Sequence, residues 1–218
     1  PGPLASGAAD GLLLAVWIGT SLALLASLRL SAWTVRRNER GWSSRTVDGE
    51  RVQVSTAFGP GVIGAVGARI VLPEWVLGSA PWLRRLIVRH EIEHVRAGDT
   101  RLLRLAVTVT ALLPWCLPLW WQLDRLRAAI ETDCDARVLA ATGTPRAYAN
   151  ALVSIAGRPG RRPLPVPALA PRPGELERRI RLIAEGRSAR SMKLGLGLLF
   201  AAALGVVTLG LVPAPAAP

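Results

Sequence analysis

Three uncharged apolar runs constrain the fold of this chain more than any other feature of its sequence. They cover residues 11–28, 105–122 and 194–212, and each approaches the roughly 20 residues that a helix needs to cross a bilayer. Only 19% of the 218 residues are charged and the mean hydropathy is +0.32, whereas an ordinary soluble domain carries about a quarter charged residues. The composition therefore indicates a membrane protein.

The basic residues predict how the chain is oriented. The net charge is +12, and the arginines gather after the first run, between 29 and 45, and before the last, between 172 and 190. By the positive-inside rule, the sequence between the first and third runs lies in the cytoplasm, which predicts a multi-pass protein of the inner (cytoplasmic) membrane. Because orientation and anionic lipid account for these clusters, we expect a lipid membrane as partner and no direct contact with nucleic acid.

The central part of the chain has the pattern of a small sheet followed by helices. Residues 52–56 alternate, a Gly-Pro-Gly turn follows, and 62–66 and 69–72 are rich in β-branched side chains, which predicts a small antiparallel sheet. Residues 31–50 are polar and basic and are expected to form a linker. From Pro81 the period becomes helical, and further helices are expected over 117–141, 145–156 and 174–184.

Both histidines of the chain fall in one short motif. In His90-Glu91-Ile92-Glu93-His94, the histidines are four residues apart and therefore project from the same face of a helix. This HExxH arrangement is typical of zinc metalloproteases, in which the adjacent Glu91 acts as general base. The histidines continue the apolar face of the helix, where two imidazoles without a partner would be costly. The motif predicts a metal site.

A catalytic zinc usually has a third protein ligand, and the chain has no third histidine. The acidic stretch Glu131-Thr132-Asp133-Cys134-Asp135 offers one, since Glu131 and Asp135 share a helix face. Glu131 would bind the metal while Asp135 orients a ligand imidazole from behind. The alternative is that these acids only balance nearby arginines on a solvated helix. Asp99 is a further candidate for orienting a ligand or for the end of the helix.

These motifs together resemble the M56 family of membrane-anchored zinc peptidases, typified by the antibiotic-sensing transducers of β-lactam resistance. The matching segments lie in the expected order within about 52–155: residues 70–73, 90–99, 131–139 and 144–149. We expect no extracellular sensor domain after the last run.

The resemblance implies a mostly helical, zincin-like (gluzincin) catalytic domain, which makes the chain an α+β membrane protein flanked by transmembrane helices. It implies Zn²⁺ bound by His90, His94 and Glu131, with Glu91 as the general base that takes a proton from the attacking water. The substrate would be a protein or peptide, with a transcriptional repressor as one candidate. Tyr148 or Arg146 is a candidate for stabilising the oxyanion, and ordinary helix packing is the alternative for Tyr148.

A shared zinc site also restricts the middle apolar run. If His90, His94 and Glu131 bind one ion, the run between them begins and ends on the same side of the membrane. Pro114 and Pro118 would break its helix, which predicts a membrane-associated helical hairpin over 102–122. The expected organisation is a transmembrane anchor at 11–30, a cytoplasmic-side zinc peptidase domain at 46–156, a Pro/Arg-rich loop and basic juxtamembrane helix at 157–193, and a transmembrane helix at 194–212.

Three functions compete on this evidence. The first is a membrane-anchored zinc endopeptidase that cleaves a cytoplasmic or membrane-proximal protein in regulatory signalling. The second is a signalling scaffold that uses the same fold without hydrolysis, and the third is a membrane peptidase of the M48 type. The sequence favours the enzyme, because a scaffold does not need Glu91 beside the metal. The spacing of Asp99 and the stretch from Pro145 to Tyr148 favour M56 over M48.

Overall fold

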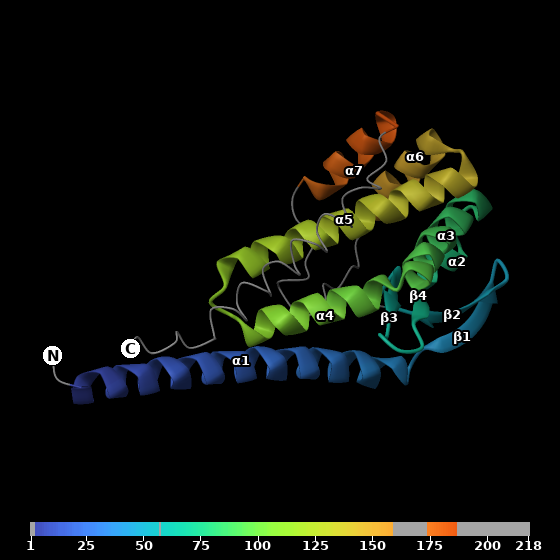
Figure 1. The fold of residues 1–218 in the computed structure, drawn as a ribbon. Helices are drawn as coiled ribbons and strands as arrows, with labels where there is room; N and C mark the ends of the chain where they lie inside the picture. Colours follow the sequence, from blue (N-terminus) through green and yellow to red (C-terminus); the bar gives the residue numbers. More distant parts are fainter. Residues whose placement is uncertain (1–2, 57, 159–173, 187–218) are drawn as a thin grey trace.

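The computed structural model describes residues 3–56, 58–158 and 174–186 as a long first helix, a four-stranded sheet and further helices packed against them (Figure 1). The elements are α1 (Pro3–Glu39), β1 (Ser43–Val47), β2 (Glu50–Ser55), β3 (Gly61–Ile63), β4 (Arg69–Pro73), α2 (Glu74–Leu77), α3 (Pro81–Ala97), α4 (Asp99–Leu112), α5 (Leu117–Thr142), α6 (Pro145–Ala156) and α7 (Glu175–Ala184).

The first helix has the length and composition of a membrane span. Among the described residues, Ala9–Glu39 is the one segment that meets both criteria, and only 6% of its most apolar window is buried against the rest of the protein. Leu12, Leu13 and Leu22 are each more than 60% exposed, an unusual number of large apolar side chains for a helix surrounded by water. The third apolar run, 194–212, lies outside the described residues.

The sheet is mixed, so the expectation of an antiparallel sheet was wrong. Its strand order is β1-β2-β4-β3; β2 pairs parallel with β4, whereas β1 with β2 and β3 with β4 are antiparallel. Strand β4 has an inner position, and its Ile70, Val71 and Leu72 are all buried, as is usual for a strand whose two faces are covered. The shorter β3, whose residues are partly exposed, lies at the edge.

The segment 31–50 is not a linker. Helix α1 continues to Glu39, and β1 follows at Ser43–Val47. An ion pair between Glu39 and Arg69 of β4, with Nη2 and Oε2 2.8 Å apart, joins the end of α1 to the sheet. The strand was missed because β1 has the exposure pattern of an outer strand, with only Val47 buried, and so carries no alternation of apolar residues.

A glycine and a proline-containing turn set the directions of the helices around the centre of the molecule. Gly98 has φ +66° and donates its N–H to the carbonyls of His94 and Val95, which ends α3 and lets α4 begin at once in a new direction. The chain turns again at 113–116, between α4 and α5. At this turn the Leu112 carbonyl accepts hydrogen bonds from Trp17 Nε1 (2.8 Å) and Ser21 Oγ (3.3 Å) of α1. Helix α4 thus lies along α1, and α5 packs on α4 (Figure 1).

Two apolar clusters hold these elements together. The larger one packs one face of the sheet against α3, α5, α6 and α7, and includes Leu72, Ile87, Val138 and Tyr148. The smaller one joins α4 to α5, with Leu28 of α1 packed against it. Helix α3, which carries both histidines, therefore lies between the sheet and α5 (Figure 1).

Candidate metal centre

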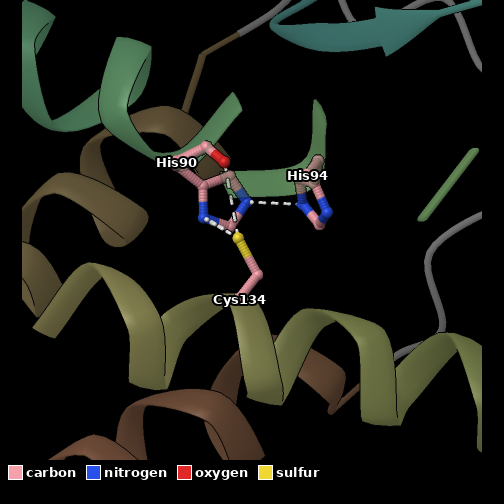
Figure 2. Close-up of side chains that lie close together, drawn as sticks. All are labelled: His90, His94 and Cys134. Atoms are coloured by element: carbon pink, nitrogen blue, oxygen red, sulfur yellow. Dashed lines mark hydrogen bonds between the residues drawn. The ribbon is translucent and has the colours of Figure 1, made fainter. Parts of the chain in front are cut away.

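The two histidines face each other from consecutive turns of α3. His90 Nε2 and His94 Nε2 are 3.2 Å apart, and Figure 2 shows both rings on the side of α3 that faces α5. The side chains are 14% and 11% exposed. This placement follows from the helical period, because Leu83, Leu86 and Ile87 on the same side of α3 are buried and residues four apart share that face.

The partner of His94 fixes the protonation of its ring. Asp99, at the start of α4, has Oδ2 2.8 Å from His94 Nδ1. A carboxylate can only accept, so the proton of the neutral ring is on Nδ1 and the lone pair on Nε2. Burial opposes protonation of His94, but the hydrogen bond to Asp99 and the charge of Glu131 outweigh it and raise the pKa of His94 above its usual value.

Asp135 fixes the protonation of the His90 ring in the same way, through the Tyr148 hydroxyl that lies between them. The Tyr148 hydroxyl of α6 donates to Asp135 Oδ1 at 2.6 Å and lies 2.8 Å from His90 Nδ1. Because burial and Asp135 raise the pKa of Tyr148 well above its usual value, the phenol stays protonated. Its single O–H is used in the hydrogen bond that it donates to Asp135. His90 must then donate from Nδ1 to the Tyr148 oxygen, which leaves its lone pair on Nε2.

A metal ion fits this arrangement. Both hydrogen-bond networks leave a lone pair on Nε2, and two lone pairs 3.2 Å apart repel each other unless a cation lies between them. Two nitrogens bound tetrahedrally to one zinc at 2.0–2.1 Å lie about 3.3 Å apart. Carboxylate partners behind ligand imidazoles are the usual support of such sites. The donor set and its spacing therefore suit a divalent metal of the zinc type.

Two residues compete for the place of the third ligand. Glu131 has Oε2 3.7 Å from His90 Nε2 and Oε1 3.7 Å from His94 Nε2. Cys134 also belongs to a possible metal cluster with the two histidines, within 4.8 Å, but its sulfur lies 3.3 Å from Nδ1 of His90 (Figure 2). That nitrogen carries the proton, and burial and nearby carboxylates raise the pKa of Cys134. The sulfur thus lies at the ring edge opposite the Nε2 lone pair that would bind a metal, so the geometry favours Glu131.

Arg179 of α7 is a site residue that the sequence did not indicate. Its Nη1 lies 2.8 Å from Glu131 Oε2, while its Nε and Nη2 donate to the two oxygens of Asp135 at 2.8 and 2.6 Å. Burial raises the pKa of Glu131, but His90 and Arg179 outweigh it and hold that pKa well below its usual value. In the sequence, Arg179 is one of several arginines on a short basic helix, and no local pattern distinguishes it from its neighbours.

A second arginine supports the other side of the centre. Arg137 of α5 has Nη2 3.4 Å from Asp99 Oδ2 and Nε 3.3 Å from Glu93 Oε2, and it also pairs with Asp133. The second glutamate of the motif, Glu93, therefore lies in a buried ion-pair network with Arg137. Each histidine thus has a carboxylate behind it, and each of these carboxylates pairs with an arginine.

A cleft of about 380 Å³ opens onto the centre. His90, Glu91, His94 and Glu131 line it together, and Glu91 is only 5% exposed. The structure thus brings the four predicted residues to one cleft, places Asp99 and Asp135 behind the histidines, and directs the Tyr148 hydroxyl toward Nδ1 of His90. Arg146 has no hydrogen bond or ion pair to any of these residues in the described part of the chain.

Comparison with known proteins decides the family. The sequence model described as BlaR1 peptidase M56 matches residues 6–183, which is most of the chain. The chain belongs to the M56 peptidase family. No curated protein and no solved structure matches it. Membership of M56 confirms the resemblance, decides against the M48 alternative and implies a membrane-associated metallopeptidase.

Proposed function

We propose that this M56 protein is a zinc-dependent endopeptidase that is anchored in the membrane by α1, with a gluzincin-type site formed by α3 and α5. The observation that carries the proposal is the pair of Nε2 atoms 3.2 Å apart, with a Glu131 oxygen 3.7 Å from each. His90, His94 and Glu131 would hold the ion. Zinc would supply a Lewis acid that polarises the peptide carbonyl and makes water nucleophilic near neutral pH.

The other residues of the cleft have separate roles in this proposal. Glu91 lies beside His90 in the cleft and would take the proton of the attacking water, then pass it to the leaving amine. Asp99 holds His94 in the tautomer that binds metal, and Tyr148 does so for His90. The Tyr148 hydroxyl already bonds His90 and Asp135, so we assign it to positioning the ligand rather than to stabilising an oxyanion.

The substrate would lie as an extended strand along β3. This strand is one of the two edge strands of the sheet, and its Gly61 and Val62 line the cleft of the metal centre. An edge strand offers unpaired backbone groups to which a peptide can add. The guanidinium of Arg101 on α4 donates to the Ala65 carbonyl at 2.7 Å, which fixes the β3–β4 loop next to the centre.

The packing on α1 supports a site at the membrane surface. The Leu112 carbonyl bonds Trp17 and Ser21, which lie near the middle of the first apolar run. From there α4 leads back toward the site over 14 residues, or about 20 Å, whereas half of the hydrocarbon core is about 15 Å. The hairpin would thus be membrane-embedded and Asp99 just outside the hydrocarbon, on the cytoplasmic side. A membrane-proximal or cytoplasmic protein, with a transcriptional repressor as one candidate, would be the substrate.

The proposal is tested by separating metal binding from proton transfer. Purified protein in detergent should contain about one zinc per chain by metal analysis, as three protein ligands require. Glu91→Gln should keep this zinc, because Glu91 is not needed as a ligand, but should lower the rate of cleavage of a peptide library about 100- to 10,000-fold. Glu177→Gln, at a side chain that is 75% exposed on α7, is the matched control and should cut like wild type.

Two results would contradict the peptidase. One is wild-type protein without zinc. The other is a Glu91→Gln variant that cleaves at the wild-type rate, since the reaction would then not use this centre. The non-hydrolytic scaffold would instead be supported if the wild-type chain binds zinc but cleaves nothing, and if the Glu91→Gln variant signals normally.

A further inference from the structure

The third ligand of the centre is held by an element from a distant part of the chain. Glu131 is on α5, whereas Arg179 is on α7, which begins at Glu175. Arg179 is the one arginine that pairs with Glu131 in the described part of the chain, and its side chain is 15% exposed. A cation this far from water is retained only where it is paired, and within the described residues the partners of Arg179 belong to the metal centre.

The guanidinium bonds Glu131 and Asp135 with three different nitrogens. Nε and Nη2 bind Asp135 side-on, and Nη1 binds Oε2 of Glu131. A planar guanidinium has donors in a fixed fork that suits such contacts, which an ammonium cannot reproduce. The position of Glu131 is therefore set relative to Asp135, which in turn bonds Tyr148 and so lies behind His90.

Without this arginine, Glu131 and Asp135 would be two like charges one turn apart on α5, which repel each other. Asp135 is 4% exposed and accepts a hydrogen bond from Tyr148, whereas Glu131 is 32% exposed and can turn its carboxylate toward water. Arg179 removes the repulsion and holds Oε2, while Oε1 stays on the side of His94.

We propose that Arg179 is a positioning residue for the metal ligand Glu131, so that the affinity for zinc depends on the docking of α7. The inference rests on the proposed metal site. It predicts that loss of Arg179 changes the zinc affinity in the direction opposite to the one expected from electrostatic repulsion alone. A guanidinium near a divalent ion repels it, so loss of the charge alone would strengthen zinc binding, whereas loss of the positioning contact weakens it, by about 10- to 100-fold for residues that support ligands.

The experiment measures the dissociation constant of Zn²⁺ for the full chain in detergent, by competition with a chelating dye at fixed pH. Arg179→Gln should bind zinc 10- to 100-fold more weakly than wild type. Arg179→Lys, which keeps the charge but not the fork, should be intermediate. Arg181→Gln is the matched control, because Arg181 is on the same helix but 67% exposed and paired with Glu177 on the surface; it should bind like wild type.

A double-mutant cycle separates positioning from general loss of structure. If Arg179 acts through Glu131, adding Arg179→Gln to Glu131→Gln should change the remaining zinc affinity by less than threefold, whereas a general defect would add to it. Unchanged or tighter zinc binding by Arg179→Gln overturns the inference while leaving the proposed function intact, and wild-type protein without zinc overturns both. If Arg179→Gln does not fold, Arg179→Lys decides, and full affinity in that variant overturns the inference.

Discussion

Replacing Tyr148 with phenylalanine would remove a single hydroxyl from the centre of the molecule. Tyr148 is 1% exposed, and phenylalanine keeps its ring and so the packing of α6. The hydroxyl bonds Asp135 Oδ1 at 2.6 Å and His90 Nδ1 at 2.8 Å. The variant therefore tests whether this hydroxyl positions a ligand or acts on the reacting carbonyl.

The structure sets the size of the effect. A hydrogen bond to a charged group is worth about 1.5–3 kcal/mol, but Asp135 keeps both contacts with Arg179, which leaves an expected loss of about 1–2 kcal/mol in the free energy of unfolding of the metal-free protein. His90 Nδ1 keeps the Cys134 sulfur at 3.3 Å as a weaker partner. We therefore expect zinc affinity to fall about 10-fold, the lower end of the effect of residues behind metal ligands.

The assay combines zinc competition, thermal unfolding of the metal-free protein and cleavage of the peptide library. Thr132→Val is the matched control, because Thr132 is also buried on α5 and, among the described residues, its hydroxyl bonds only the carbonyl one turn back, at 2.7 Å; it should keep wild-type zinc affinity. An oxyanion role predicts the opposite pattern for Tyr148→Phe, with unchanged zinc affinity and a turnover number about 100- to 1,000-fold lower. That pattern would refute the positioning role.

Two further predictions concern the environment of the site. Topology reporters fused at Ser44 and Pro159 should both indicate the cytoplasm and one at Ala217 the exterior; opposite locations for Ser44 and Pro159 would rule out a shared metal site on one side. Zinc affinity should be constant at high pH and fall as the pH decreases through the pKa of His94, because only the unprotonated Nε2 binds metal. Since that pKa is raised above 6.5, a plot of log Kd against pH should bend above pH 6.5, and a bend below it would contradict the assigned role of Asp99.

Local signals in the sequence were sufficient for most of the helices. Helix α3 begins at Pro81 and ends before Gly98, and α5 ends before Gly143, because proline is tolerated in a first turn and glycine adopts the left-handed conformation after a last one. The HExxH spacing predicted that both histidines share one face of α3. The i, i+4 spacing of Glu131 and Asp135 likewise predicted that they share one face of α5. These are short-range properties and can be read from periodicity.

The parts that were missed depend on contacts between distant segments. Strand order is one, since the parallel pairing of β2 with β4 places β4 inside the sheet, and no local pattern determines which strand lies at an edge. The role of Arg179 is another, because α7 also carries Arg178 and Arg181 and only its packing against α5 selects the residue that reaches Glu131. The sequence made Tyr148 a candidate for the site, but its two partners follow from how α6 packs.

The metal centre and the hydrophobic core are parts of one structure. Cys134 and Tyr148 contact His90 and also belong to the cluster that packs the sheet, α3, α5, α6 and α7. Without an ion, the two Nε2 lone pairs repel each other inside this cluster, and any proton that relieves the repulsion must be taken up at a buried site. A bound ion removes that cost only when all four helices are docked, so metal binding and tertiary packing stabilise each other. Zinc should therefore raise the unfolding temperature of wild-type protein more than that of Arg179→Gln, in which α7 no longer holds the third ligand.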